Sequence, residues 1–447
     1  MKWISCTVTV VVLWVTAVST GGTLCDSDGV ICRISNLNIT SSPEAFTLLA
    51  QQPSSVTTYT SVMIQQLIMG STTIADLLIN ASTITNSVLF KKFHEKNIFL
   101  PRKVTLEALT VQEARNLQTF IIPTNKHLKQ LEITHCAVSI VPPAFRNLVS
   151  LKELRLKLCS IKTLNLALLA TLRHLETVQL IGNNITTIYP PQSALAANIR
   201  TVDLSYNQLR RIDMSVLRSL KLMQTLNLEH NQLSTVDYRP GEVVTLPRLT
   251  TLRLSNNKLE RISFEQLNAT SLEYLVLSSN RFITVPEYLQ NFPNLALLAL
   301  DNNLLESFDF SILQSLGNLQ WLELHDNHLA SVVLPKEIDL PYLHQLLLAN
   351  NRLQSVNLEQ LYAPRLSLLD LRNNLLTTIP NVFEKGIEQL ESVNVVDNPL
   401  TCGTYETYRK YIHLGMIVPK WVLQNADLCS TGTYFTLTET QRVCCLV

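Results

Sequence analysis

Apolar and polar residues alternate in one short pattern that recurs along most of the chain. From Leu249 to Leu259 it reads L-x-x-L-x-L-x-x-N-x-L, with the Asn at position 257. The alternating half predicts a short strand with one buried face, because successive side chains of a strand point to opposite sides. Asn, or Cys in its place, recurs every 23 to 26 residues at positions 136, 159, 183, 207, 231, 257, 280, 303, 327, 351, 374 and 398. So regular a period predicts a solenoid of stacked coils.

This motif is the signature of the leucine-rich repeat. We therefore expect an α/β solenoid: a horseshoe with a parallel β-sheet on its concave face, an irregular or short-helical convex side and cysteine-containing end caps. In each coil the recurring Asn should turn inward, where its amide can bond backbone groups of the bend and of the adjacent coil. Cys136 and Cys159 hold the first two places of this ladder. We interpret them as small buried thiols, although coils about 5 Å apart also permit a disulfide.

The repeats divide the chain into three predicted regions. The clear repeats span residues 128–401. Residues 20–127 are predicted to form an N-terminal cap with degenerate repeats, because apolar residues keep the spacing there without the Asn. These residues are Val62, Ile64, Leu67, Val104, Leu106 and Leu109. We expect three or four further coils in this region.

Residues 402–447 are predicted to form a cysteine-containing C-terminal cap. Tyr405, Tyr408, Tyr411 and Ile412 recur there at helical spacing. This spacing predicts a helix laid over the last open coil. A ligand-binding aromatic stripe is the alternative interpretation.

Residues 1–19 have the features of a secretory signal peptide. Lys2 supplies the positive end, residues 4–15 the apolar core, and Ala17-Val18-Ser19 a cleavage site. A membrane anchor is the alternative, and the apolar run is short for it. We expect a secreted, extracellular protein. Four Asn-x-Ser/Thr triplets are candidate glycosylation sites in such a protein, at Asn38, Asn80, Asn184 and Asn268.

Removal of the leader takes away Cys6 and leaves eight cysteines, which fits disulfide formation in an oxidising compartment. Cys25 and Cys32 are expected to close a small N-terminal loop. Cys402 is expected to pair with Cys429, because that loop encloses the predicted helix. Cys444 and Cys445 are then left to bridge elsewhere, to bond each other, or to link the protein covalently to another chain. The last four residues also match a prenylation box, but that modification belongs to the cytosol.

Composition and motifs argue for binding rather than catalysis. The chain is 46% hydrophobic and carries a formal net charge of +1, which argues against a nucleic-acid partner. No catalytic motif is recognised, and no cofactor or metal is expected. His325, Asp326 and Glu323 could suggest a metal or a general base, but exposed strand positions are expected to be polar.

The outward strand positions form a predicted concave face. In the early coils they are charged, with Glu132, Glu153, Arg155, Lys157, Asp203, Tyr206, Glu229, His230 and Arg253. In the later coils apolar and aromatic residues, such as Ala299 and Leu368, are edged by polar ones, such as Asp370 and Arg372. Such a patch on a solvent-facing sheet suggests an interface, although the side chains could simply pack against one another. The hypothetical partner-binding residues are Tyr274, Val276, Leu297, Asp301, Trp321, Glu323, His325, Asp326 and Leu347.

The leader, the repeats and the two cysteine-containing ends resemble an extracellular leucine-rich-repeat protein. The tail, with Cys402, Cys429 and the Cys444-Cys445 pair, further resembles the mosquito leucine-rich-repeat immune proteins, in a form without the C-terminal coiled coil. The resemblance implies innate-immune recognition of a complement-like thioester protein, another leucine-rich-repeat protein or a pathogen surface. A cell-adhesion or receptor-like role is the alternative, disfavoured because no anchor is expected.

Overall fold

The computed structural model describes residues 26–27, 31–34, 37–38, 59–68, 74–191, 198–383, 389–423, 429, 432–438 and 441–447. The predicted signal peptide and Cys25 lie outside these ranges. The chain divides into two compact units, Met1–Gln208 and Leu209–Val447. Each unit is described separately below.

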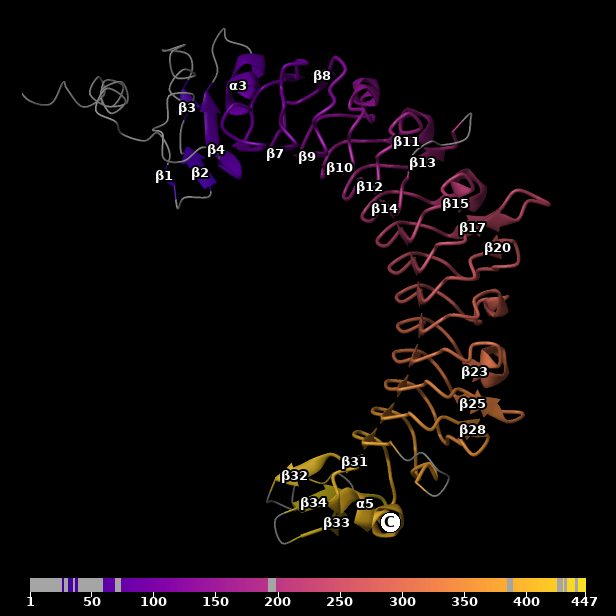
Figure 1. Ribbon diagram of the computed structural model, residues 1–447. Coiled ribbons are helices and arrows are strands. Elements are labelled where there is room, and N and C mark those ends of the chain that lie inside the picture. The colour runs from indigo at the N-terminus through magenta and orange to yellow at the C-terminus, as the bar shows by residue number, and fades with distance from the viewer. Residues whose placement is uncertain are drawn as a thin grey trace, which may run out of the picture. The chain divides into compact units, whose positions relative to one another are not determined.

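The first unit is built on a parallel sheet that takes one strand from each successive coil (Figure 1). Its strands are β2 (Ile31–Ile34), β4 (Ser61–Ile68), β5 (Ser87–Lys92), β7 (Ala108–Val111), β9 (Gln130–Thr134), β10 (Glu153–Lys157), β12 (Thr177–Gln179) and β14 (Thr201–Asp203). Two short strands flank β2 and β4, namely β1 (Asp26–Ser27), antiparallel to β2, and β3 (Leu37–Asn38), parallel to β4. The degenerate region therefore contributes β4, β5 and β7, in which Val62, Ile64 and Leu109 point into the core.

Short elements form the opposite side of the first unit. Helix α3 (Ile74–Ala81) buries Ile74, Leu77, Leu78 and Ala81 on one face, as an amphipathic helix should. Elsewhere this side consists of strand pairs and single 3₁₀ turns. These are β6 (Asn97–Phe99) with β8 (Thr119–Ile121), β11 (Thr163–Asn165) with β13 (Thr187–Tyr189), η1 (Pro143–Asn147) and η2 (Leu166–Leu168).

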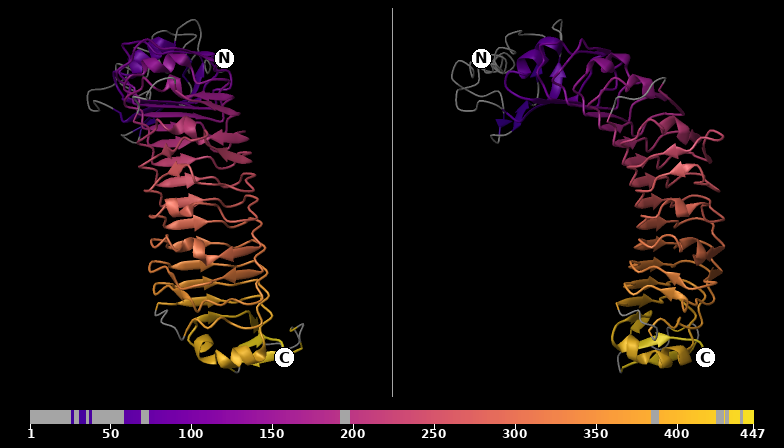
Figure 2. Two further views of the ribbon diagram at one scale, coloured as in Figure 1. Left: turned by 90° about the vertical axis from the view of Figure 1, so that its right-hand side faces the viewer. Right: turned by 45° about the vertical axis from the view of Figure 1, so that its right-hand side comes forward.

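The second unit repeats the same arrangement with great regularity, as the stacked strands in Figure 2 show. Its sheet contains β16 (Thr225–Asn227), β19 (Thr251–Arg253), β21 (Tyr274–Val276), β22 (Leu297–Ala299), β24 (Trp321–Glu323), β27 (Gln345–Leu347), β29 (Leu368–Asp370), β30 (Ser392–Asn394) and β31 (Ile417–Val418). Every pairing described between these strands is parallel and joins equivalent positions of consecutive coils. The last strand, β31, lies beyond the repeats recognised in the sequence.

The opposite side of the second unit combines strand pairs with 3₁₀ turns. The pairs are β15 (Arg211–Asp213) with β17 (Thr235–Asp237), β18 (Val244–Thr245) with β20 (Leu267–Asn268), β23 (Ser307–Asp309) with β25 (Ser331–Val333), and β26 (Ile338–Asp339) with β28 (Leu361–Tyr362). The turns are η3 (Met214–Leu217), η4 (Leu289–Asn291) and η5 (Phe310–Leu313). Buried phenylalanines pack edge-on behind the sheet, as Phe264 and Phe292 do with ring centroids 5.0 Å apart. The short-helical back side predicted from the sequence is confirmed.

The asparagine ladder is confirmed in both units. Asn257 shows the typical geometry in the second unit: its Nδ2 donates to the carbonyl of Leu228 in the preceding coil, at 3.0 Å, and to that of Leu254 in its own. Its Oδ1 accepts the backbone N–H of Leu233 at 2.9 Å. In the first unit, Asn183 and Asn207 make the equivalent bonds. One buried amide therefore satisfies backbone groups of two coils.

Cys136 and Cys159 form a disulfide, so the interpretation as buried thiols is wrong. Parallel pairing of β9 with β10 brings the two Cα atoms within 4.4 Å, and the sulfurs are 2.14 Å apart. Two cysteines on consecutive rungs meet the geometric requirement for a bond. Cys32 is also disulfide-bonded and fully buried.

The C-terminal cap begins with α4 (Cys402–Thr407) and α5 (Arg409–His413). Tyr405 and Ile412 are buried, while Tyr411 stacks on Phe383 with ring centroids 4.0 Å apart. These rings therefore pack mainly within the protein. An antiparallel sheet of β32 (Trp421–Leu423), β34 (Gln441–Cys444) and β33 (Tyr434–Thr436) follows.

The expected Cys402–Cys429 pair is wrong. Cys402 bonds Cys445, and Cys429 bonds Cys444. The reason is that the chain after β34 returns to the start of α4, where the N–H of Cys402 donates to the carbonyl of Leu446 at 2.8 Å. Of the three possibilities left open for Cys444 and Cys445, the structure shows bridges to other cysteines of the chain, and it contradicts a bond between the two and a covalent link through them to another chain. Such disulfides persist in oxidising compartments, which fits an extracellular location.

Candidate functional site

The candidate site is the solvent-facing side of four consecutive strands of the second unit, β21, β22, β24 and β27. We call it the Trp321 face. It comprises the outward residues of these strands and of the bends that follow them. Its first row is Tyr274, Leu297, Trp321 and Gln345, and its second row is Val276, Ala299, Glu323 and Leu347. Members of a row are direct pairing partners, so they lie about 4.8 Å apart along the sheet.

The first three members of the first row form an aromatic and aliphatic strip, which ends at the polar Gln345. Tyr274 is 38% exposed, and Leu297 and Trp321 are half-buried. In the second row, Val276 and Leu347 are half-buried, whereas Ala299 is only 2% exposed. Except for Ala299, these side chains therefore keep part of their surface in solvent. Tyr274, Leu297 and Trp321 thus form a column across three paired strands, with Leu297 and Trp321 partly covered.

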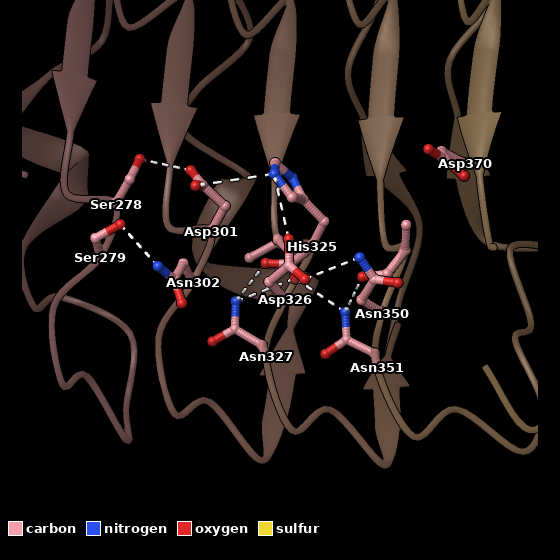
Figure 3. Close-up of polar contacts among 12 residues, drawn as sticks. Ser278, Ser279, Asp301, Asn302, His325, Asp326, Asn327, Asn350, Asn351 and Asp370 are labelled. Carbon is pink, nitrogen blue, oxygen red and sulfur yellow. Dashed lines mark hydrogen bonds and ion pairs between the residues drawn. The ribbon is translucent and has the colours of Figure 1, made fainter. Parts of the chain in front are cut away.

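Acidic groups lie beside this strip, at the C-terminal ends of the strands (Figure 3). His325 Nε2 lies 3.8 Å from a carboxylate oxygen of Asp301 and 3.8 Å from one of Asp326. Ser278 donates from Oγ to Asp301 at 2.5 Å. Strand pairing therefore gathers carboxylates from two neighbouring coils around one imidazole.

Glu323 is the residue of the face whose ionised form is disfavoured by its surroundings. Burial raises the pKa of its carboxyl, the negative charge of Asp301 raises it further, and His325 lowers it in part. Removing a carboxylate from water disfavours its ionised form, and a like charge nearby adds to that cost. Glu323 therefore gains from any additional cation that approaches the face.

A row of polar residues lies in the bends that follow the strands, where the backbone is left-handed. Asn302, Asp326, Asn350 and Asn373 have φ between 49° and 55°, a region that Asn and Asp tolerate better than other residues with a side chain. Asn350 Nδ2 donates to Asp326 Oδ1 at 2.8 Å (Figure 3). Asn373 Nδ2 donates in turn to Asn350 Oδ1 at 2.9 Å. Asn302 donates to Ser279 in the same manner. The row fixes Asp326 at the rim of the face.

The sequence carried a signal for this row that the prediction of the face did not use. Asn-Asn doublets occur at Asn256-Asn257, Asn302-Asn303, Asn350-Asn351 and Asn373-Asn374. The second Asn of each doublet belongs to the ladder, and the first takes the left-handed bend. A fifth doublet, Asn183-Asn184, has its ladder residue first and Gly182 at the left-handed bend. A doublet therefore marks both positions only where its second Asn keeps the ladder period.

The charges that border the Trp321 face are already paired. Arg372 donates to Asp370 through two nitrogens, at 3.0 and 2.8 Å, and this bond raises the pKa of the guanidinium. Asp370 is buried as a result, contrary to its expected place at an exposed edge. On the other side, Arg253 lies 3.9 Å from Glu229.

The sheet face of the first unit carries pairs of opposite charges instead of an apolar strip. Arg155 lies 2.5 Å from Glu153 and 3.9 Å from Glu132, and Lys157 lies 3.1 Å from Glu132. These opposite charges satisfy one another. The early coils therefore present a polar surface whose opposite charges are paired. The Trp321 face, in the later coils, holds carboxylates with no lysine or arginine in its rows and bends.

His325 is not arranged as a general base. Both carboxylates approach Nε2, while Nδ1 is buried and has no hydrogen-bond partner within the described part of the chain. A catalytic histidine requires one nitrogen to be oriented by a partner while the other is free to take a proton. Among the described residues, no group of three or more His, Cys, Asp or Glu is placed to hold a metal ion. Nor is any helix there long and apolar enough to cross a membrane.

Of the four candidate glycosylation sites, Asn268 belongs to the same unit as the Trp321 face, and the other three belong to the first unit. Asn184 is exposed in the bend after a ladder residue, and Asn268 is exposed on β20, on the opposite side of the second unit. Asn80 lies in α3 and is half-buried. Asn38 lies in β3, and its side chain is outside the described part.

Comparisons with known proteins show that the chain is similar to leucine-rich-repeat proteins. The family described as "Leucine rich repeat" matches residues 197–259, and a related repeat profile matches residues 271–292. Bovine osteomodulin (Bos taurus) is 27% identical over 52% of this chain and 53% of its own length. Mouse podocan (Mus musculus) is 33% identical over 36% of this chain and 27% of its own length.

A solved leucine-rich-repeat protein of Leptospira interrogans has a similar fold, with a TM-score of 0.54 and 19% sequence identity. The match covers 90% of this chain and 97% of that one. The chain spans about half, or less, of the length of the first curated relatives that it matches. The predicted leucine-rich-repeat solenoid is confirmed.

Proposed function

We propose that this leucine-rich-repeat protein is a secreted scaffold that binds a protein partner through the Trp321 face. The observation that carries the proposal is the column of Tyr274, Leu297 and Trp321, whose members are direct neighbours on three paired strands. Large half-exposed rings in a row offer apolar area at low entropic cost, and Trp and Tyr are frequent anchors of protein interfaces.

Rigidity also supports a binding role. The column stands on a sheet whose coils are joined by ladder bonds, such as those of Asn303 and Asn327. A preformed surface loses little conformational freedom when it binds. The absence of an oriented base at His325 is consistent with binding as the activity of this face.

The finer proposal is recognition in innate immunity, with a complement-like thioester protein, another leucine-rich-repeat protein or a pathogen surface as the partner. The C-terminal cap supports this proposal, because the adjacent cysteines Cys444 and Cys445 pair with Cys429 and Cys402. That tail carries the resemblance to the mosquito immune proteins. Secretion is proposed from the leader and from the disulfides of the described residues.

A pull-down from body fluid with the purified protein, followed by mass spectrometry, tests the proposal. Trp321→Ala should weaken capture of the specific partner about thirtyfold, because an aromatic hot spot commonly contributes about 2 kcal/mol. Tyr362→Ala is the matched control, since this ring is 53% exposed on β28, on the opposite side of the unit. Equal capture by both variants, with both folded, would move the interface away from the Trp321 face.

A further inference from the structure

The Trp321 face carries negative charge without a matching strong cation. Its rows and bends hold Asp301, Glu323 and Asp326 but no lysine or arginine. His325 is the basic group among them, and it already contacts two of the three carboxylates. The nearest arginines at equivalent positions of the flanking strands, Arg253 and Arg372, have carboxylates of their own. The face is therefore complementary to positive charge.

The geometry also favours a planar cationic group. Trp321 and Glu323 belong to one strand two residues apart, so both side chains project from the same side of the sheet. Asp301 follows the strand on one side of this pair. A planar guanidinium can stack on an indole ring while its edge donates to carboxylates, which an ammonium group does less well.

We propose that the Trp321 face binds an arginine-bearing extended segment of the partner protein, with the guanidinium stacked on Trp321 and directed at Glu323 and Asp301. This inference rests on the proposed function, because it names the chemistry of the partner at the same face. The aliphatic neighbours Leu297 and Leu347 then contact the apolar part of the arginine side chain and the residues beside it.

The state of Glu323 supports this occupant. Burial and Asp301 raise the pKa of its carboxyl in the free protein, and a bound guanidinium would lower it. The affinity should therefore be full above that raised pKa and fall as the pH drops through it. Three charged or titratable groups lie around Glu323: Asp301 in the bend after β22, and His325 and Asp326 in the bend after β24. On the other side, the facing positions of β27 and its bend are uncharged, with Gln345, Leu347 and Ala349.

Titration with two synthetic peptides tests the proposal. One carries arginine at alternate positions, and the other carries citrulline, which has nearly the same shape without the charge. Binding is followed by NMR through the indole signals of the secreted protein. Trp321 and Trp421 should be the two contributors, since the other two tryptophans lie in the predicted signal peptide. The arginine peptide should shift the Trp321 signal, leave Trp421 unchanged and bind about tenfold more tightly than the citrulline peptide. Equal affinity, or no shift of Trp321 with either peptide, would overturn the proposal.

Two variants separate this proposal from the general one. Glu323→Gln combined with Asp301→Asn removes the two charges at which the guanidinium is directed while keeping side-chain shape, including the acceptor that Asp301 offers to Ser278. The arginine peptide should lose its advantage over the citrulline peptide in this double variant, and the body-fluid partner should bind about tenfold more weakly. If Trp321→Ala loses the partner but the double variant does not, the face is the interface and the arginine inference is wrong. If neither variant loses the partner, the proposed function itself fails.

Discussion

The side-chain amide of Asn303 donates a hydrogen bond to the backbone carbonyl of Leu277, one coil earlier, at 3.2 Å. The same side chain donates to Leu300 and accepts the N–H of Phe282 at 3.1 Å. Asn303→Leu should therefore leave several buried backbone groups without partners. We expect a loss of about 3 kcal/mol or more in the free energy of unfolding, because each such group costs about 1–3 kcal/mol. Denaturation in urea, followed by circular dichroism, measures it.

Asn294→Leu is the control for the ladder. Asn294 is exposed, and its amide donates to the carbonyl of Thr270 at 2.8 Å. Its Oδ1 also accepts from Asn318 Nδ2 at 3.3 Å. Loss of these two exposed bonds should change stability by less than about 1 kcal/mol. A ladder variant no less stable than this control would refute the structural role of Asn303.

Glu323 should make the stability of the protein depend on pH. Its folded-state pKa is raised by burial and by Asp301, so its ionised form opposes folding. Glu323→Gln should stabilise the protein by less than about 1 kcal/mol above the folded-state pKa, since the group is half-exposed and screened. This gain should shrink as the pH falls through the folded-state pKa and vanish below the unfolded one. A variant that is less stable than the wild type at neutral pH would contradict the electrostatic account.

The disulfide map of the secreted protein should contain Cys136–Cys159, Cys402–Cys445 and Cys429–Cys444. Peptide mapping without reduction measures it, and a peptide that joins Cys402 to Cys429 would disprove the cap. Wild-type protein should run as a monomer on a non-reducing gel. Cys429→Ser should release Cys444 and allow covalent dimers, because the lone thiol then has no partner in the cap.

The pairing in the tail shows where sequence reasoning reached its limit. The ladder and the strand register follow from a period that repeats the same physical requirement in every coil, so Asn257 and its equivalents could be placed without a structure. Nothing periodic governs the cap. The bond between Cys402 and Cys445 depends on β34 bringing the chain back to Leu400, whose carbonyl accepts the N–H of Leu446, and this long-range contact has no local signature in the sequence.

The sequence predicts which side chains of the candidate site point outward, but not how far each is buried. Alternation along each strand predicted that the side chains of Tyr274, Leu297 and Trp321 point outward. It did not fix how much of each would be covered, because coverage depends on neighbours in adjacent coils, as the nearly buried Ala299 shows. The exposure of Asp370 was predicted wrongly for the same reason, since Arg372 folds over it.

A sugar chain placed on the rim of the Trp321 face should block the partner without altering the face itself. Leu304→Thr completes an Asn-x-Thr triplet at Asn302, which is exposed on the bend beside Asp301. Leu304 is 40% exposed, and its hydrogen bond to Phe282 uses the backbone, so the substitution should cost little stability. Protein secreted from eukaryotic cells should carry the added glycan and bind the partner at least about tenfold more weakly, because the glycan occupies the space that the partner needs. Enzymatic removal of the glycan should restore binding. Asn268→Gln, which deletes a natural triplet on the opposite side of the unit, should leave binding unchanged. Undiminished binding by the fully glycosylated Leu304→Thr protein would show that the partner docks elsewhere.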